Sequence, residues 1–437
     1  MNRSLVDRRW LRLLPPECSA LAFFFVMASY YIVRPVRDQL SGAVGSTTLP
    51  LFYAATFSVM LLLTPVFGAL VARFQRRRLL GWIYGFFILC LCAFVPAFLA
   101  QDYLGPRMLG VIFFVWVSVF NLFVVSLFWS FMADIFSSES ARRVFPLIAL
   151  GGMAGAVFGP VLTSLLVSLL GVAPLLVVSA AMLGAALALL LKLSVQHEHL
   201  VGAASNEAIG GSLWAGVKEL WSRPFLRYMA ILMLLGDGIG TLAYALVADY
   251  AKAHFTENAA RTAFYAHIDL AVNGIGALLQ LSLTRWLLIR RGAGWGLLLP
   301  TIVNVALLLI VMIFGTSHVI GLGYAVSWVT LMLIVTRGFA YGMTKPATDA
   351  LYTRVPRETR YKGKNFVETA VWRFGDLVVT SGVSGLGKLG MSVASMAAIG
   401  LVASCTATWV ARRAGSSPDL LPEPSPETSS EPLPGGR

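Results

Sequence analysis

Long apolar runs dominate this sequence of 437 residues and limit the folds that it can adopt. Twelve stretches of about 20 mostly apolar residues follow one another between charged or Pro/Gly-containing breaks, and each is long enough to cross a bilayer. Only 13% of the residues are charged, whereas 57% are hydrophobic. Because an open sheet leaves backbone groups unpaired in lipid, the spans must be helices. The sequence therefore predicts an all-α integral membrane protein with twelve transmembrane helices.

The basic residues indicate how these spans are oriented. The formal net charge is +13, but the bases lie in alternate connections between spans, which argues against a nucleic-acid binder. The opposite set of connections clearly holds only Arg107, Lys252, Arg261 and Lys388. Cytoplasmic loops of membrane proteins carry the excess of Lys and Arg. We therefore expect a multi-pass membrane protein with both termini in the cytoplasm. We further expect a monomer that lies in a bacterial inner (plasma) membrane.

A long polar connection divides the chain into two halves. Residues 1–193 are expected to form an N-terminal six-helix bundle, and residues 224–413 a C-terminal six-helix bundle. Residues 194–223 would be a cytoplasmic central loop, in which Ser212–Trp221 could form a short amphipathic helix at the membrane surface. Residues 414–437 are rich in Pro, Ser and Glu, which predicts a disordered cytoplasmic tail.

Ionisable side chains inside membrane spans are costly, so they are candidate functional residues by default. They occur in the first, seventh, eighth, tenth and eleventh spans, of which the tenth is expected from about Val319 to Met343. The candidates for binding a substrate are Tyr30, Arg34, Arg37, Arg337, Lys345 and Arg373. The candidates for coupling or gating are Asp38, Asp237, Asp269, Asn273, Asp349, Glu368 and Asp376.

Several of these residues also have a purely structural interpretation. Asp38 lies four residues after Arg34, and Asp349 lies four residues after Lys345, which is the spacing of ion pairs on one helix face. Such pairs would only close the ends of helices. Asp269 and Asn273 lie on one helical stripe, which would either face a wet cavity or form hydrogen bonds between helices.

A short sequence echo connects the two halves. Residues 30–40 and 341–351 share the order Tyr, three residues, a base, Pro, two residues, Asp, one residue and Leu. Internal repeats of this kind are found in many transporters. Counting spans places Arg34 and Lys345 toward opposite membrane faces, so we expect them to act in opposite gates rather than to hold one ligand together.

Motifs for enzyme chemistry are weak in this sequence. Gly382–Lys388 fits the start of a phosphate-binding P-loop, but Leu389 replaces the magnesium-binding Ser or Thr and no strand precedes it. His197 and His199 have no third ligand nearby, so a solvated loop is favoured over a metal site. We therefore predict that the chain is not an enzyme and uses no metal or cofactor.

The twelve spans, the basic loop after the second span and the long central loop resemble the major facilitator superfamily. Four stretches resemble its ATP:ADP antiporter (nucleotide translocase) branch and the bacterial relatives of that branch: YYIVRPVRDQL, FWSFMADIFSSESARRVFPLIALGG, RTAFYAHIDLAVN and YGMTKPATDALYTRVPRETRYKGKNFVETAVWRFGD. The resemblance implies nucleotide exchange, with Arg37 as a first-helix base that serves the phosphates. Thr348 stands where the translocases have a lysine, and Val117–Asn121 holds no counterpart of their fourth-helix acid.

These observations together predict a secondary active transporter that works by alternating access. Guanidinium groups bind carboxylate and phosphate through two parallel hydrogen bonds, so the expected partner is a small organic anion, with nucleotides such as ATP and ADP as one candidate. The alternative is a sensor or membrane scaffold that has the shape of a transporter but does not transport. Its buried charges would then be structural ion pairs.

Overall fold

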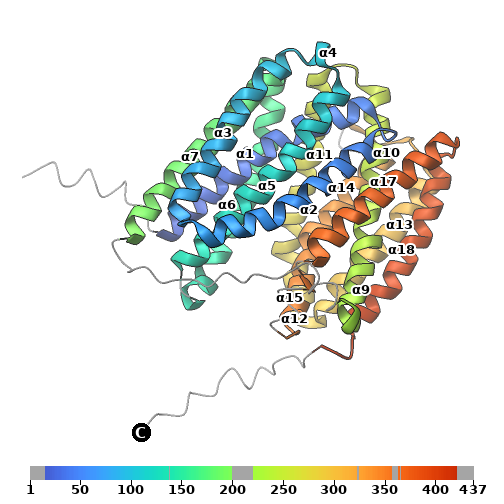
Figure 1. Ribbon diagram of the computed structural model, residues 1–437. Coiled ribbons are helices and arrows are strands. Elements are labelled where there is room, and N and C mark those ends of the chain that lie inside the picture. The colour runs from blue at the N-terminus through green and yellow to red at the C-terminus, as the bar shows by residue number, and fades with distance from the viewer. Residues whose placement is uncertain are drawn as a thin grey trace, which may run out of the picture.

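Two helical bundles form the protein, as Figure 1 shows. The computed structural model describes residues 15–136, 138–198, 220–321, 324–356, 363–364 and 366–420. The N-terminal bundle consists of α1 (Pro15–Val44), α2 (Leu49–Arg73), α3 (Arg76–Leu99), the short α4 (Gln101–Leu104), α5 (Pro106–Ile135), α6 (Ser138–Leu170) and α7 (Ala173–Glu198).

The C-terminal bundle is more interrupted, and four of its helical segments are π-helices, marked η. Its elements are α9 (Pro224–Leu232), η1 (Met233–Asp237), α10 (Gly238–His254), α11 (Asn258–Leu279), η2 (Gln280–Thr284), α12 (Arg285–Arg291), α13 (Ala293–Phe314), β1 (His318–Gly321), β2 (Tyr324–Ser327), α14 (Trp328–Phe339), η3 (Ala340–Thr344), α15 (Lys345–Tyr352), η4 (Val367–Val371), α17 (Trp372–Lys388) and α18 (Val393–Gly415).

Ten helices within the described residues are long and apolar enough to cross a membrane. Two further helical segments complete the set of twelve: Trp328–Tyr352, built from α14, η3 and α15, and Val367–Lys388, built from η4 and α17. These two carry the charges of the predicted tenth and eleventh spans and are therefore less apolar. The predicted all-α fold with twelve membrane helices in two bundles is confirmed.

The start of the tenth span differs from the prediction. Residues from Val319 onward were expected to be helical, but β1 and β2 pair antiparallel, with His318 opposite Ser327. The helix begins only at Trp328, where the Ser327 side chain accepts a hydrogen bond from the Thr330 backbone N–H and caps α14. Hydropathy alone does not separate a short apolar strand from the first turns of a helix, which is why the prediction placed this boundary too early.

Other boundaries also lie beyond their predicted positions. Helix α7 continues to Glu198, so the first bundle extends into the predicted central loop. Helix α18 ends at Gly415, and the Asp419 carboxylate behind it accepts a hydrogen bond from the Phe225 backbone N–H at the start of α9. Only the last two residues of the predicted amphipathic helix at Ser212–Trp221 are among the described residues. The predicted tail lies outside them after residue 420.

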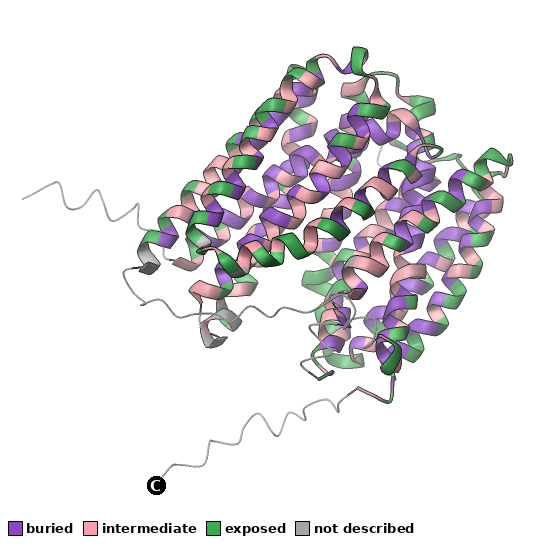
Figure 2. Ribbon diagram, in the orientation of Figure 1, coloured by how far each residue is buried: buried purple, intermediate pink, exposed green. Residues whose placement is uncertain are grey.

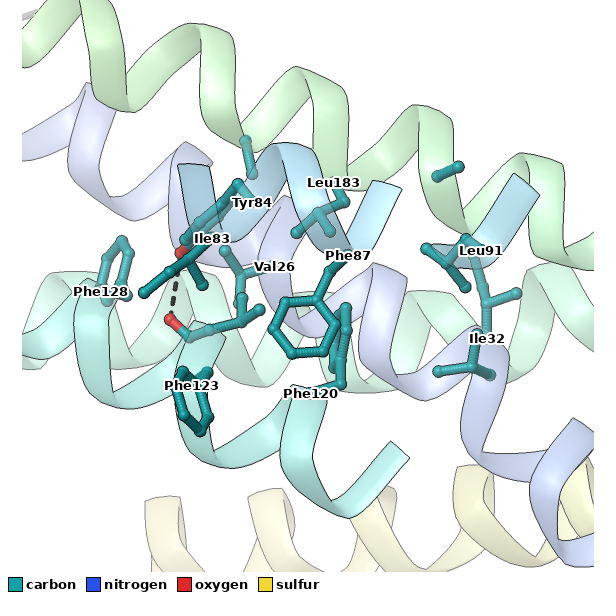
Figure 3. Close-up of a cluster of buried hydrophobic side chains, with 14 of the residues drawn as sticks. Val26, Ile32, Ile83, Tyr84, Phe87, Leu91, Phe120, Phe123, Phe128 and Leu183 are labelled. Carbon is teal, nitrogen blue, oxygen red and sulfur yellow. Dashed lines mark hydrogen bonds between the residues drawn. The ribbon is translucent and has the colours of Figure 1, made fainter. Parts of the chain in front are cut away.

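Aromatic and aliphatic side chains fill the centre of the N-terminal bundle. Figure 3 shows that these side chains come from α1, α3, α5 and α7 and meet around Phe87 and Phe120, whose ring centroids are 5.2 Å apart. The Tyr84 hydroxyl, which is fully buried, donates a hydrogen bond to the Val124 backbone carbonyl over 3.1 Å. Figure 2 shows buried residues along the inner sides of the helices and exposed residues along the outer sides. This distribution suits helices whose outer faces meet lipid.

Small residues bring α6 close to α1. A Cβ atom at Gly151 would lie 2.2 Å from the Ala20 carbonyl oxygen, and a Cβ atom at Gly155 would lie 2.2 Å from the Phe24 carbonyl oxygen. Real Cβ atoms do not approach backbone oxygens so closely, so only glycine permits this helix contact. These glycines therefore serve the packing of α6 against α1.

Replacing Gly155 by Ala is expected to lower the free energy of unfolding by about 1–3 kcal/mol, because the backbones of α1 and α6 must separate. The matched control is Gly184→Ala on α7, where the added Cβ meets no atom within 4 Å. Thermal unfolding of both variants in the same detergent measures the difference. Equal melting temperatures for the two variants would contradict close packing of α1 against α6.

The two bundles are joined at one end of the molecule, called here the closed end, which contains the turn between α1 and α2. The hydrogen bonds across this end are Ser41 Oγ with Tyr244 OH (2.6 Å), Ser46 N to Asp249 Oδ1 (2.7 Å), Lys252 Nζ to Val44 O (3.1 Å) and Ser384 Oγ to Thr47 O (3.1 Å). Figure 1 shows the bundles diverging toward the opposite end, called here the open end, which contains α9, α12 and α15. This asymmetry makes one end of the bundle interface more accessible than the other.

Candidate functional site

A cavity of about 270 Å³ lies between the two bundles and is called here the central cavity. Helices α1, α2 and α5 line it from the N-terminal bundle, and α10, α11, α14, η3 and α17 line it from the C-terminal bundle. Its charged lining residues are Arg34, Arg37, Asp38, Asp269, Arg337, Arg373 and Asp376. Seven of the thirteen predicted site residues thus meet in one place, and Tyr30 is an eighth.

Arg37 and Asp38 form the tighter of two ion-pair groups on α1. The Arg37 Nη2 atom lies 2.6 Å from Asp38 Oδ1, and its Nε atom donates to the same oxygen over 2.7 Å. The Arg37 guanidinium also lies over the Phe114 ring, 4.5 Å from its centroid. Asp38 in turn accepts a hydrogen bond from the Tyr244 hydroxyl of the other bundle over 2.9 Å. Arg37 is therefore held by contacts within the N-terminal bundle, and Asp38 connects it to the closed end.

Arg34 is held more loosely than Arg37. Its Nε atom lies 3.5 Å from Asp269 Oδ1 on α11 and 4.0 Å from Asp38 Oδ2, which are long distances for hydrogen bonds. The Arg34 Nε atom and the Asp269 Oδ2 atom are both buried without a hydrogen-bond partner among the described residues. Buried polar atoms are usually satisfied, so both atoms have capacity for a further partner in the cavity.

Arg337 lies at the centre of a network in the C-terminal bundle. Its Nη1 atom lies 2.6 Å from Asp237 Oδ1, and its Nη2 atom donates to the Thr241 hydroxyl over 3.3 Å. The indole N–H of Trp372 donates to the other oxygen of Asp237. A Cβ atom at Gly240 would lie 2.8 Å from Arg337 Nε, so glycine at this position lets the guanidinium approach α10.

The network continues from Thr241 to the eleventh span. The Thr241 hydroxyl donates to Asp376 Oδ1 over 2.6 Å, and Arg373 Nη1 lies 3.7 Å from Asp376 Oδ2. Arg373 keeps a longer contact than Arg337 does. Its guanidinium stacks over the Trp372 ring, 4.9 Å from the centroid. Of the four cavity arginines, Arg34 and Arg373 thus have the longest contacts with carboxylates.

Lys345, Asp349 and Glu368 form a separate cluster away from the central cavity. Lys345 Nζ lies 2.6 Å from Glu368 Oε1 and 3.2 Å from Asp349 Oδ1, and half of the Lys345 side chain is exposed. Lys364, which follows a basic connection between spans, also joins this cluster, 2.7 Å from Asp349 Oδ1. The sequence interpretation missed Lys364 because charge in a loop is normally explained by topology.

The two bases of the sequence echo lie in different surroundings. Arg34 lines the central cavity, whereas Lys345 belongs to the cluster on α15 and η4 and does not line that cavity. Asn273 differs from its expected stripe partner Asp269, because its side-chain amide donates to the Ala156 backbone carbonyl over 3.0 Å. Asn273 therefore joins α11 to α6, which is the interhelical alternative left open for this stripe.

Several residues of the site have only weak signals in the sequence. Tyr53, Tyr244 and Tyr265 all line the central cavity, and nothing in the local sequences of Tyr53 and Tyr265 distinguishes them from ordinary core tyrosines. Tyr244 could have been found, because it lies seven residues after Asp237 on the same helical side. The π-helices were not predicted either: η1 ends at Asp237, η3 contains Tyr341, and η4 contains Glu368. Short π segments inside α-helices often mark functional sites.

The described residues contain no group of three or more metal-ligating side chains. Gly382–Lys388 lies inside the continuous helix α17, so the P-loop interpretation is excluded by the backbone. What the central cavity offers is guanidinium donors, carboxylates and tyrosine hydroxyls at an interface between two bundles. Such an arrangement suits binding of a polar small molecule, without any activated nucleophile.

The bundle architecture is shared with several solved transporters. A bacterial homologue of the iron transporter ferroportin in its inward-facing state superposes with a TM-score of 0.63, at 15% identity over 91% of this chain and 97% of that chain. The nucleoside transporter NupG gives a TM-score of 0.61 at 11% identity, over 92% of this chain and 99% of that one. The POT family transporter PepTSo gives a TM-score of 0.63 at 13% identity, over 92% of this chain and 98% of that chain. At these identities the likeness concerns the fold alone.

No curated protein sequence matches the chain. The family model described as Major Facilitator Superfamily matches residues 19–366, which include nearly all of the N-terminal bundle, the C-terminal bundle as far as α15, and five of the seven charged residues that line the central cavity. The match covers well over half of the sequence, and it agrees with the two bundles, the central cavity and the fold of the solved transporters. The chain belongs to the Major Facilitator Superfamily and is a membrane transporter rather than an enzyme.

Proposed function

We propose that this transporter moves or exchanges a small organic anion, which binds in the central cavity and crosses the membrane by alternating access. The observation that carries the proposal is the presence of four arginines on one cavity between the bundles. Guanidinium groups bind carboxylate and phosphate oxygens through pairs of charge-assisted hydrogen bonds. Arg34 and Arg373 are the primary anion ligands in this proposal, because their contacts to carboxylates are the longest.

The charge balance of the cavity limits how much negative charge a substrate can carry. Its lining has four arginines and three aspartates, which leaves one positive charge in excess. Asp237 does not line the central cavity, but it pairs with Arg337 and so offsets that excess. A polyanion such as a nucleoside triphosphate would need more unpaired bases than this cavity supplies. Thr348, which replaces the translocase lysine, lies outside the lining of the central cavity. A carboxylate or a singly charged phosphate ester is therefore a better fit than ATP.

Asp269 and Asp376 are the proposed coupling residues. A bound anion would compete with them for Arg34 and Arg373, and a displaced carboxylate in a buried site would be neutralised most easily by a proton. Entry of an anion into a nearly neutral cavity would then go together with proton uptake or with release of another anion. Under the predicted topology, the open end faces the cytoplasm, and the substrate would enter this conformation from that side.

The test is uptake by the purified protein in liposomes under imposed substrate or proton gradients. The panel contains monocarboxylates, sugar phosphates, nucleoside monophosphates and ATP. We expect uptake of at least one monoanion, reduced about tenfold or more in Arg34→Ala by loss of a charged hydrogen bond. Arg412→Ala is the matched control, because Arg412 is exposed in the last turn of α18. If no panel member moves, the proposal fails and the non-transporting alternative is favoured.

A further inference from the structure

A second cavity of about 450 Å³ lies within the C-terminal bundle and is called here the side chamber. Its lining residues all come from the C-terminal half, in contrast to those of the central cavity. Apolar side chains form much of its wall, including Met229, Leu232, Met233, Leu297 and Pro300. A chamber of this size and character is large enough for part of an organic ligand.

The charges on the side chamber neutralise one another. Its four charged lining residues form two close pairs: Asp237 with Arg337 at 2.6 Å, and Lys345 with Glu368 at 2.6 Å. Neither pair leaves a net charge that would attract an ion. Apolar cavities tend to bind apolar groups because water gains little by filling them. The side chamber therefore suits an uncharged, apolar part of a molecule.

The two cavities adjoin each other. Arg337, Tyr341 and Trp372 line both of them, so these three side chains form a shared wall. Arg337 lines both cavities and pairs with Asp237, which lines only the side chamber. A ligand whose charged group reached Arg337 from the central cavity would have its remaining atoms beside the side chamber.

We propose that the transported anion is amphipathic, with its charged group in the central cavity and a single apolar chain or ring in the side chamber. This inference rests on the proposed anion function and defines its substrate class more narrowly. The chamber holds one chain or ring system, so a soluble single-chain anion is favoured over a two-chain phospholipid.

The experiment measures binding to the whole protein in lipid nanodiscs by titration calorimetry. The probes are methanesulfonate, butanesulfonate, hexanesulfonate and octanesulfonate, which carry the same permanent single charge and differ only in chain length. Heats from empty nanodiscs are subtracted to remove partition into lipid. We expect the Kd to fall by about fourfold for each added methylene until the chamber is filled.

Two variants fill the side chamber from different positions. Gly236 lines the chamber, and a Cβ atom there would have its nearest neighbour at 3.6 Å, which is ordinary van der Waals contact. Gly236→Leu and Met233→Trp are expected to remove the dependence on chain length and to leave methanesulfonate binding unchanged. Gly184→Leu on α7, which meets no atom within 4 Å at the Cβ position, is the control and should keep the dependence. Gly236 is next to Asp237 in the sequence, so its substitution could distort the Asp237 site. The same result from Met233→Trp would show that filling of the chamber is the cause.

The possible outcomes separate this inference from the function on which it rests. If methanesulfonate binds but chain length has no effect, or if the filled variants keep the effect, the amphipathic substrate class is wrong and the anion function stands. If no sulfonate binds at any length, both proposals fail. Nanodiscs with and without phosphatidylglycerol should give the same Kd for octanesulfonate. A weaker Kd with phosphatidylglycerol would mean that a lipid occupies the chamber, and it would overturn the assignment to a soluble anion.

Discussion

Replacing Arg337 by Ala is expected to reduce transport by about 30-fold or more and to lower the free energy of unfolding by about 3 kcal/mol. The side chains of Arg337 and Asp237 are only 13% and 15% exposed, and their closest atoms are 2.6 Å apart. Removing the guanidinium leaves the Asp237 carboxylate in a mostly buried place with Trp372 as its remaining described hydrogen-bond partner. An uncompensated buried charge of this kind is among the most destabilising changes that a single substitution can make.

A double variant separates the structural role of Arg337 from its role in transport. Arg337→Met combined with Asp237→Leu removes both charges, and apolar replacements of a buried pair are often neutral for stability. We expect the double variant to recover most of the lost melting temperature but not the lost uptake, because Arg337 also faces the central cavity. Melting temperature and liposome uptake are measured on the same preparations, with Arg412→Ala as the exposed control.

Recovery of uptake in the double variant would contradict a direct role for Arg337. The pair of Arg337 and Asp237 would then only stabilise the bundle. This is the alternative in which the buried charges are structural ion pairs. A second check uses Gly240→Ala, whose added Cβ would lie 2.8 Å from Arg337 Nε. This substitution keeps both charges but displaces the guanidinium, so it should reduce uptake with a smaller loss of stability.

The fold could be predicted from the sequence because its main determinants are local. Apolar runs of membrane length, interrupted by charged connections, predict the spans without knowledge of their packing. The exception is the hairpin at His318–Ser327, where an apolar, β-branched segment forms strands outside the helices. Hydropathy measures how apolar a segment is, but it does not report the backbone geometry of a short run.

The candidate residues of the site could also be found from the sequence, since charge inside a span is unusual on its own. Their pairing could not be found. Asp237 and Arg337 are 100 positions apart in the sequence, and Arg34 meets Asp269 on another bundle. Local spacing suggested two pairs within one helix, and they differ in length: Lys345 lies 3.2 Å from Asp349, but Arg34 lies 4.0 Å from Asp38.

The presence of two cavities that share a wall could not be predicted from the sequence. The side chamber depends on how α9, α13 and the π-helices pack, and no residue pattern reports an empty volume. The π segments widen their helices by one residue per turn and thereby re-aim the side chains around Asp237, Tyr341 and Glu368. A single extra backbone residue in a turn leaves no compositional trace. The site was therefore predicted as a set of residues. The structure was needed to assign most of them to the central cavity, to the side chamber, or to the cluster of Lys345, Asp349 and Glu368, two members of which also line the side chamber.

Cross-linking the closed end is expected to stop transport completely and reversibly. Alternating access requires the contacts among Ser41, Tyr244, Ser46 and Asp249 to separate during each cycle, because they join the two bundles on one side of the central cavity. The variant carries Ser46→Cys and Asp249→Cys, whose positions are in direct contact, since Ser46 N donates to Asp249 Oδ1 over 2.7 Å. The background lacks the free native cysteines, Cys18, Cys90, Cys92 and Cys405.

A short bifunctional methanethiosulfonate reagent is suited to this pair, because it tolerates small deviations from disulfide geometry. We expect uptake to fall to the level of empty liposomes after cross-linking and to return after reduction with dithiothreitol. Each single cysteine variant, treated in the same way, should keep its uptake, which excludes an effect of the reagent alone. Full uptake by the cross-linked pair, with cross-linking verified by mass spectrometry, would show that this end does not open during transport. The closed end would then be a permanent seal, and any movement of substrate would require a route that leaves these contacts intact.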